Sequence, residues 1–438
     1  MKNNKKQEDL TEQKLKEKSL KISTKEGSAA SIMRGAGDTY ITPYALALGA
    51  TNMQVGFLSS FVGLFGAISQ IIGSRTVYKF SRKKIVLLSV FLQATMWIVM
   101  LALGLLVWKG IIINNSAIIL IILYTIGVIC GSLGGPAWFS WMGDLVQEEK
   151  RGNYFSKRSR ITGAISMATT LIAAFLLDYT KAIGLILIGF AIISLISAIG
   201  RFISLYFLVK QYEPKSKIEK ESYFSFIQFL KKAPFNNYGK FVFYVGLMTL
   251  ATNFAGPFFT VYMLKELNYS YAWFMAVNLA GTLFTIMSIP FWGKIGDKYG
   301  NKTLLKIGGI VVIFNPIFWI FSGNPIYLIF TAQLFAGFGW AAFNLGASNY
   351  IYDAVTPQRR AICVAYYTMI NGICVFIGAS SGGLFAQYVH VNFMNIFLLI
   401  FLISGILRGI ISIIFLPKIK EVRKNVKKEN TIEILKTL

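Results

Sequence analysis

Two side chains of opposite charge, Arg34 and Asp38, lie in a stretch with no other charge, SAASIMRGAGDTYITPY over residues 28–44. A spacing of four residues places them on one face of a helix, about one turn apart. Two glycines and a proline in the same stretch favour a bend. Asp38 is a candidate carrier of a proton or a cation, with Arg34 as its counter-ion or as an anchor for an anion. The alternative is a self-neutralised structural pair, with Arg34 reaching toward the aqueous surface.

The sequence offers few of the residues that enzymes use. His390 is the only histidine, and the three cysteines, Cys130, Cys363 and Cys374, all lie in apolar stretches. Histidine-based triads, multi-histidine metal sites and disulfide frameworks are therefore excluded. No GxxxxGK[ST] sequence occurs, which excludes a P-loop ATPase. We expect a protein that is not an enzyme and that needs neither a cofactor nor a metal.

The composition is that of a membrane protein. Hydrophobic residues make up 55% of the 438 residues and charged residues 14%, whereas soluble domains carry about 25% charged residues. At a mean hydropathy of +0.57, this much apolar surface must face lipid. The formal charge of +25 comes from short basic runs between apolar stretches. We therefore expect a lipid bilayer, and no nucleic acid, as the partner of the chain.

Apolar stretches near 20 residues recur along the chain, and about 20 residues of helix cross a hydrocarbon layer. We predict twelve transmembrane helices. The predicted spans are residues 28–48, 53–74, 84–108, 117–142, 154–177, 182–209, 240–263, 271–293, 303–322, 325–351, 361–387 and 392–416.

Basic residues in the connections predict the orientation, because cytosolic loops carry an excess of lysine and arginine. If both termini are cytosolic, that side carries 38 basic residues and the opposite side only Lys109, Lys181 and Lys265. We expect a multi-pass protein of the cell membrane with both termini in the cytosol. Residues 1–27 and 417–438 are then solvated basic tails.

The longest connection, residues 210–239, divides the spans into two sets of six. Tyr223, Phe226, Ile227, Phe229 and Leu230 approximate a helical apolar stripe, which is followed by two lysines. This pattern is typical of a helix that lies in the membrane interface. The alternative is a segment that merely tethers the two halves.

The two halves of the chain repeat one another. The matching positions, at offsets of 207 to 220 residues, are Gly73 with Gly293, Asp144 with Asp353, Arg151-Gly152 with Arg360-Ala361, and Arg201 with Arg408. Because six spans per repeat give both copies the same orientation, we predict an all-α membrane protein with two parallel six-helix bundles over residues 28–209 and 240–416. This is the architecture of a rocking transporter.

One loop carries a family resemblance. The segment GKIGDKYGNK, residues 293–302, resembles the GxxxD(R/K)xG loop of the major facilitator superfamily and lies between the eighth and ninth spans. Its first-half counterpart, residues 73–84, keeps Gly73 and Arg82 but has Val77 where the family has aspartate. The resemblance covers residues 28–416.

The resemblance implies a gate at the cytosolic side. Gly293 would allow close helix packing and an abrupt end to its span, and Asp297 would latch onto the start of the fifth span. The alternative for Asp297 is an ordinary surface ion pair. The residues implied in gating are Gly73, Arg82, Gly293, Asp297, Lys298 and Gly300, with Asp144, Arg151, Gly152, Asp353 and Arg360 in the matching loops.

The resemblance also places the first, fourth, seventh and tenth spans around a central cavity. The candidate substrate and coupling residues are Arg34, Asp38, Tyr40, Trp138, Thr252, Asn253 and Asn344. For Trp138 and the neighbouring Trp141, a place in the interfacial aromatic belt is the alternative, and we favour the belt for Trp141. Arg201 and Arg408 lie in spans that are peripheral in this architecture, so we expect both to be structural.

These features predict a monomeric secondary transporter that moves a small molecule by alternating access. Proton coupling is favoured, because Asp38 is the sole carboxylate predicted deep inside a span. The alternatives are a transporter-like solute sensor or receptor and an uncoupled facilitator. A membrane-embedded enzyme has little support.

Overall fold

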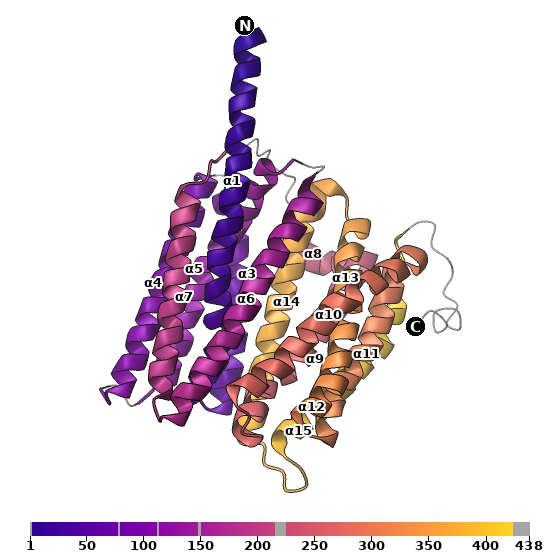
Figure 1. The fold of residues 1–438 in the computed structure, drawn as a ribbon. Helices are drawn as coiled ribbons and strands as arrows, with labels where there is room; N and C mark the ends of the chain where they lie inside the picture. The colour runs from indigo at the N-terminus through magenta and orange to yellow at the C-terminus, as the bar shows by residue number, and fades with distance from the viewer. Residues whose placement is uncertain (1, 78, 112–113, 148–149, 215–224, 424–438) are drawn as a thin grey trace. The chain divides into compact units, whose positions relative to one another are not determined.

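The computed structural model describes residues 2–77, 79–111, 114–147, 150–214 and 225–423. All regular structure in these ranges is helical, and the chain divides into two compact units, Met1–Glu219 and Lys220–Leu438. The boundary falls inside the 210–239 connection. In Figure 1, the first unit runs from indigo to magenta and the second from magenta to yellow.

Long helices build each unit. Unit 1 contains α1 (Lys2–Ala36), a 3₁₀ turn (Asp38–Tyr40), α2 (Ile41–Ala47), α3 (Asn52–Thr76), α4 (Arg82–Trp108), α5 (Ser116–Leu145), α6 (Arg151–Ala182) and α7 (Ile186–Val209). Unit 2 contains α8 (Phe226–Lys232), α9 (Asn237–Val261), α10 (Tyr271–Tyr299), α11 (Asn301–Phe321), α12 (Pro325–Leu328), α13 (Leu334–Ala354), α14 (Pro357–Tyr388) and α15 (Ile396–Phe415).

Eleven helices in the described ranges are long and apolar enough to cross a membrane. The predicted first span, residues 28–48, is missing from this set because its helix is interrupted. Helix α1 ends at Ala36, and the chain continues through the 3₁₀ turn into α2. Eleven of the twelve predicted spans thus correspond to such helices, the first position holds a broken helix, and the full count of twelve stays a prediction.

Gly37 lies at the interruption and explains it. A Cβ atom at this position would lie 2.4 Å from the Trp97 ring and 2.6 Å from the Ser197 hydroxyl. Only glycine lets α4 and α7 approach the backbone at position 37 so closely. Glycine also weakens a helix by about 1 kcal/mol relative to alanine. The predicted bend in this stretch is confirmed, and the turn after it carries Asp38.

The described ends of the two tails differ from the solvated segments that we expected. Residues 2–27 belong to α1, whose first turns extend beyond the neighbouring helices of unit 1 (Figure 1). Ser19, Ser23 and Glu26 are buried against unit 1. In unit 2, the backbone of Lys420 exchanges two hydrogen bonds with the Asn237 side chain, at 2.8 and 2.9 Å. Both tails are thus packed where they leave the bundles.

Part of the connecting segment forms the predicted helix. Helix α8 is capped by Ser225 and Gln228, each of which binds the other's backbone N–H. Phe229 is buried and its ring packs 5.5 Å from that of Tyr366, while Ile227 is exposed. The apolar side of α8 therefore packs on unit 2. Tyr223 lies outside the described residues.

The two motif glycines have different surroundings. A Cβ atom on Gly73 would lie 2.3 Å from the carbonyl oxygen of Leu133, so this glycine lets α3 and α5 pack closely. Around Gly293, no described atom lies within 4 Å of such a Cβ position. Helix α10 also continues through Gly293 to Tyr299. The expectation that Gly293 ends its span is wrong, and its close packing stays a prediction.

Gly300 is the glycine that ends this helix. Its φ of +90° lies in the region that favours glycine, and an added Cβ atom would meet the Glu421 carboxylate at 2.3 Å. Glu421 in turn accepts a 2.7 Å hydrogen bond from the backbone of Lys302 at the start of α11. The turn between α10 and α11 therefore depends on Gly300.

The glycine pair gives a matched stability test. We expect Gly73→Ala to destabilise the protein by about 1–3 kcal/mol, because the new methyl group collides with backbone. Gly293→Ala adds a methyl group in open space and removes a helical glycine, so it should be neutral or stabilising by up to about 1 kcal/mol. Thermal unfolding of both purified variants in detergent measures the difference. Equal melting temperatures would contradict the close packing of α3 on α5.

The basic-residue asymmetry gives a test of topology. In a protein whose cysteines are replaced by serine, Lys79→Cys and Lys232→Cys should react with an impermeant maleimide only after the cell is opened, because both positions belong to the basic side. Lys109→Cys and Lys181→Cys should react in intact cells. Labelling of Lys232→Cys from outside would overturn the arrangement of six spans in each half.

Candidate functional site

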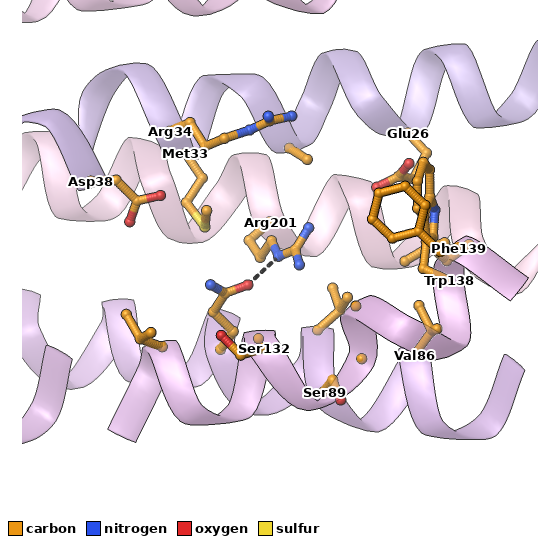
Figure 2. Close-up of a pocket in the computed structure, with 18 of the residues that line it drawn as sticks. Glu26, Met33, Arg34, Asp38, Val86, Ser89, Ser132, Trp138, Phe139 and Arg201 are labelled. Atoms are coloured by element: carbon orange, nitrogen blue, oxygen red, sulfur yellow. Dashed lines mark hydrogen bonds between the residues drawn. The ribbon is translucent and has the colours of Figure 1, made fainter. Parts of the chain in front are cut away.

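A cavity of about 590 Å³ lies inside unit 1. Its wall combines charged groups with amides, hydroxyls and apolar side chains. The charged residues are Glu26, Arg34, Asp38, Arg158 and Arg201, and the polar ones include Gln70, Ser89, Gln93, Tyr124 and Ser132. Figure 2 shows most of the labelled groups converging on one space. Ionisable groups in a membrane bundle mark functional sites by default, since burying them costs free energy.

Asp38 lies in the 3₁₀ turn and faces α5. Its Oδ1 atom accepts a 3.1 Å hydrogen bond from the Tyr124 hydroxyl. Arg201 and Arg34 both attract its carboxylate. A carboxylate in this position can gain or lose a proton next to a solute in the same cavity.

Arg34 and Asp38 do not form the contact pair that their spacing suggested. The helix ends between them, and the Arg34 side chain extends away from Asp38 (Figure 2). Its Nη2 atom donates instead to the Ser31 hydroxyl at 3.3 Å. The spacing rule failed because it assumes an unbroken helix. Of the two sequence interpretations, the self-neutralised pair is therefore not what the structure contains.

Arg201 lines the cavity, so the expectation that it is peripheral is wrong, while its structural role stays a prediction. Its Nε atom donates to the Gln93 amide oxygen at 2.8 Å, and its Nη1 atom donates to the Ser204 hydroxyl at 3.2 Å. Gln93 reaches it from α4, where Gly131 of α5 leaves room for the amide. Both of these hydrogen-bond partners of the guanidinium are neutral groups.

Glu26 is a second buried carboxylate, which the sequence analysis had placed in a solvated tail. Its Oε2 atom pairs with Arg158 at 2.9 Å, and its Oε1 atom accepts from Ser204 at 2.9 Å. Asp38 is therefore not the sole acid inside this bundle. A signal existed in the sequence: Ser19, Ser23, Glu26, Ala30 and Met33 follow the i, i+4, i+7 spacing of one helical face.

Trp138 also lies at the cavity, where the Arg158 guanidinium stacks 4.7 Å from its ring centroid. Two other aromatic candidates face elsewhere. Tyr40 is buried and donates to the Thr170 carbonyl at 2.6 Å, which makes it a contact between helices. Trp141 is fully buried and donates to the Tyr212 carbonyl at 2.8 Å. Its expected place in an outward aromatic belt is therefore wrong.

The remaining solute-site candidates belong to unit 2. Thr252 and Asn253, on α9, donate to carbonyls one turn back, at 2.7 and 2.8 Å. Asn344, on α13, is exposed. The role of these three residues at the solute site stays a prediction.

The loop-motif residues form equivalent contacts in the two units. The Arg151 guanidinium donates to the Gly143 carbonyl at 2.9 Å, and Arg360 donates to the Tyr352 carbonyl at 3.2 Å. Donor and acceptor are eight residues apart in both cases, and the two bonds are offset by 209 residues. Gly152 lies in the first turn of α6, the helix that begins at Arg151. The repeat seen in the sequence is thus present in the contacts.

Asp144 and Asp353 occupy equivalent places at the ends of α5 and α13. Asp144 accepts a 2.6 Å ion pair from Arg82, whose side chain is only 2% exposed. Asp353 accepts a 2.7 Å hydrogen bond from Asn301. Each aspartate therefore joins the end of one helix to the start of another, α4 in unit 1 and α11 in unit 2.

Asp297 is paired within its own unit. Arg423 donates to its Oδ1 atom at 2.9 Å, and the Asp297 side chain is 75% exposed. The ammonium of the adjacent Lys298 lies 4.8 Å from the Tyr299 ring centroid. The sequence alternative of a surface ion pair therefore describes the observed contact, and the latch stays a prediction.

A bundle of helices able to span a membrane, with a charged cavity inside it, is the architecture of membrane transporters. The profile of the Major Facilitator Superfamily matches residues 28–314 and 241–437. The chain belongs to this superfamily, as the loop motif had indicated.

Curated relatives are distant and only partly aligned. A probable peptide/nitrate transporter of Arabidopsis thaliana is 31% identical over 111 residues, which are 24% of this chain and 22% of the relative. A multidrug resistance efflux pump PmrA homolog of Lactococcus lactis is 24% identical over 214 residues, 46% of this chain and 49% of the relative. The chain thus spans less than half the length of these relatives.

Solved structures resemble the whole fold. The nucleoside transporter NupG matches with a TM-score of 0.68 and 16% identity, over 91% of this chain and 100% of that chain. A bacterial homologue of the iron transporter ferroportin, in an inward-facing state, matches with a TM-score of 0.69 and 16% identity, over 91% and 98%. At such identities the likeness establishes the fold alone.

Two carboxylate–arginine pairs of equal length give a test of burial. Glu26–Arg158 and Asp297–Arg423 both measure 2.9 Å, but the carboxylates are 6% and 75% exposed. We expect Glu26→Gln to cost about 3–5 kcal/mol, since it leaves a buried arginine unpaired. Asp297→Asn should cost at most about 1 kcal/mol. Thermal unfolding in detergent measures both, and a smaller effect of Glu26→Gln would contradict the buried pair.

Proposed function

We propose that this protein is a secondary transporter that moves a small solute across the cell membrane by alternating access, with proton coupling through Asp38. The observation that carries the proposal is the cavity of unit 1, where Asp38, Tyr124, Arg34 and Arg201 converge inside a bundle of membrane-spanning helices. Membership of a transporter superfamily supports the class of activity.

Asp38 fits a coupling role because it is the carboxylate in the cavity without an ion pair at contact distance among the described residues. Glu26 is held by both Arg158 and Ser204. Asp38 is held by one neutral hydroxyl, that of Tyr124. A proton can therefore reach Asp38 without breaking a salt bridge, whereas protonation of Glu26 would leave Arg158 unpaired.

The loop contacts support a framework for gating. Arg82 binds Asp144 and the Pro214 carbonyl, so it ties the start of α4 to the segment after α7. Glu421 and Arg423 tie the segment after α15 to the turn before α11. We propose that these contacts make each unit move as one body. The latch of Asp297 on the fifth span belongs to the same proposal.

The relatives are named after different substrates, so their names do not indicate a substrate for this protein. They include a peptide/nitrate transporter, an efflux pump and a facilitated glucose transporter. We keep the expectations of a monomer and of cytosolic termini as part of this proposal. An uncoupled facilitator or a solute receptor is separated from coupled transport by the following test.

We expect Asp38→Asn to abolish proton movement coupled to the solute while leaving solute exchange intact. Metabolites that raise the melting temperature of the purified protein are added to proteoliposomes that contain a pH-sensitive dye. The native protein should change the internal pH when such a metabolite is added, because a proton moves with it. Asp38→Asn should lose this change and still exchange radiolabelled metabolite, since the cavity keeps its shape.

Asp178→Asn is the matched control, because Asp178 lies in α6 but does not line the cavity. It should keep the pH change. An unchanged response in Asp38→Asn would reject proton coupling through Asp38 and support a facilitator. Binding without any translocation by the native protein would reject transport and support a receptor.

A further inference from the structure

The cavity of unit 1 carries more positive than negative charge. Three guanidinium groups, from Arg34, Arg158 and Arg201, face the two carboxylates of Glu26 and Asp38. Arg158 and Glu26 neutralise each other at 2.9 Å. Two guanidiniums therefore remain against the single carboxylate of Asp38, and a proton on Asp38 would leave them with no counter-charge.

Arg34 and Arg201 are held by neutral groups. Arg34 donates to the Ser31 hydroxyl at 3.3 Å, and Arg201 donates to Gln93 at 2.8 Å and Ser204 at 3.2 Å. Among the described residues, no carboxylate lies within ion-pair distance of either guanidinium. Both guanidiniums belong to the wall of the same cavity (Figure 2).

This arrangement favours a bound anion. Two like charges in a medium of low dielectric constant raise the free energy of the empty site, and an anion between them would remove that cost. A guanidinium presents its N–H groups as a planar fork that fits the oxygens of a carboxylate or a phosphate. Neither arginine uses all of its donors in the contacts above.

The remaining lining residues of the cavity indicate the chemical nature of the rest of the ligand. Met33, Val86, Val90, Val128 and Leu208 give the cavity an apolar surface beside the arginines. A volume of about 590 Å³ is within the range of pockets that hold small organic molecules. An inorganic ion would leave this apolar surface unoccupied.

We propose that Arg34 and Arg201 together form an anion-binding site, and that the solute is a small organic anion whose acidic group lies between them. That this anion is a transported solute rests on the proposed transport function, whereas the anion-binding site rests on the cavity alone. A cationic solute at Asp38 is disfavoured, because the positive charges of Arg34 and Arg201 belong to the wall of the same cavity.

Coupling with protons follows from the same charges. The charged or titratable groups around the site are Glu26, Arg34 and Asp38 from the first helical segment, Tyr124 from α5, Arg158 from α6 and Arg201 from α7. A proton on Asp38 raises the positive charge of this set, so proton binding and anion binding assist each other. The proposed transporter would then carry both in the same direction.

The test uses probes that share one aromatic body and differ in charge. Benzoate and phenyl phosphate are the anions, benzyl alcohol is the neutral probe and benzylammonium is the cation. Affinities for the purified full chain are measured by thermal shift and calorimetry in detergent. We expect at least one anion to bind about tenfold or more tightly than the neutral and cationic probes, since a charge-assisted hydrogen bond has this effect. The choice between the two anions identifies the acidic group.

Arg34→Gln and Arg201→Gln should each weaken binding of the preferred anion about tenfold or more. Arg75→Gln is the matched control, since Arg75 is an exposed cation of α3 that does not line the cavity. It should leave the affinity unchanged. Equal binding of all probes, binding of the cation alone, absence of anion binding, or anion binding that survives both cavity variants would overturn the proposal.

Replacement of Arg201 would leave its two side-chain partners unpaired, so a second measurement uses Arg34 and no ligand. Trp138 lines the cavity. Its fluorescence is obtained by subtracting the emission of Trp138→Phe from the emission of the native protein. A positive cavity concentrates iodide. Iodide should therefore quench Trp138 more strongly, relative to neutral acrylamide, than it quenches free tryptophan. Arg34→Gln should reduce this ratio, and a ratio below that of free tryptophan would overturn the positive cavity.

The two proposals fail in different ways. If an uncharged metabolite is transported and no anion binds, the transport function stands and the anion site is rejected. If the anion binds through Arg34 and Arg201 but nothing crosses the membrane, the anion site stands and transport is rejected.

Discussion

The ion pair between Glu26 and Arg158 is the interaction on which the cavity of unit 1 depends. A charge inside an apolar bundle needs a partner, and each unpaired one costs several kcal/mol. The pair fixes the first helix against α6. Through Ser204, Glu26 also positions Arg201, which then engages Gln93 of α4. One buried pair thus extends into a polar network across four helices, and the cavity surface follows from it.

The break at Gly37 adds the second constraint. Because α1 ends before this position, Asp38 does not lie on the helical face of Arg34, and its carboxylate accepts a hydrogen bond from Tyr124. An unbroken helix would have favoured a pair between Arg34 and Asp38, which would have neutralised both groups. The interruption keeps a carboxylate and a guanidinium apart in the same cavity, so each remains able to bind something else.

The sequence predicted the features that local pattern controls. Apolar length located eleven of the helices, and the glycines of the first span predicted its bend. The repeat matched Arg151 with Arg360, and the structure shows that the two make equivalent hydrogen bonds. Local sequence pattern did not predict the burial of Glu26 or the place of Arg201 at the cavity, because their partners lie 132 and 108 residues away in the chain. Pairs at such separations leave no periodic pattern, and only packing brings them together. The motif wrongly predicted that the span ends at Gly293 for a related reason, since a sequence motif gives the residue type and not the residues that pack around it.

The two units share a framework but not its chemistry. Arg408 of α15 is the repeat of Arg201, and it donates to the Val312 carbonyl at 2.8 Å. Val312 of α11 stands 219 residues after Gln93, the same offset that relates Asn301 to Arg82. Ser412 lies one helical turn after Arg408, as Ser204 lies about one turn after Arg201, but the neighbour of Ser412 is the Tyr244 hydroxyl at 3.5 Å and not a carboxylate. Arg408 is 1% exposed, which agrees with a structural role, whereas Arg201 also lines the cavity of unit 1. Duplication preserved the helix contacts, and the acids that create a charged cavity are found in the first copy. Under the proposed transport function, the titratable group is needed in only one unit, because a single site that changes its access would carry the solute and the proton together.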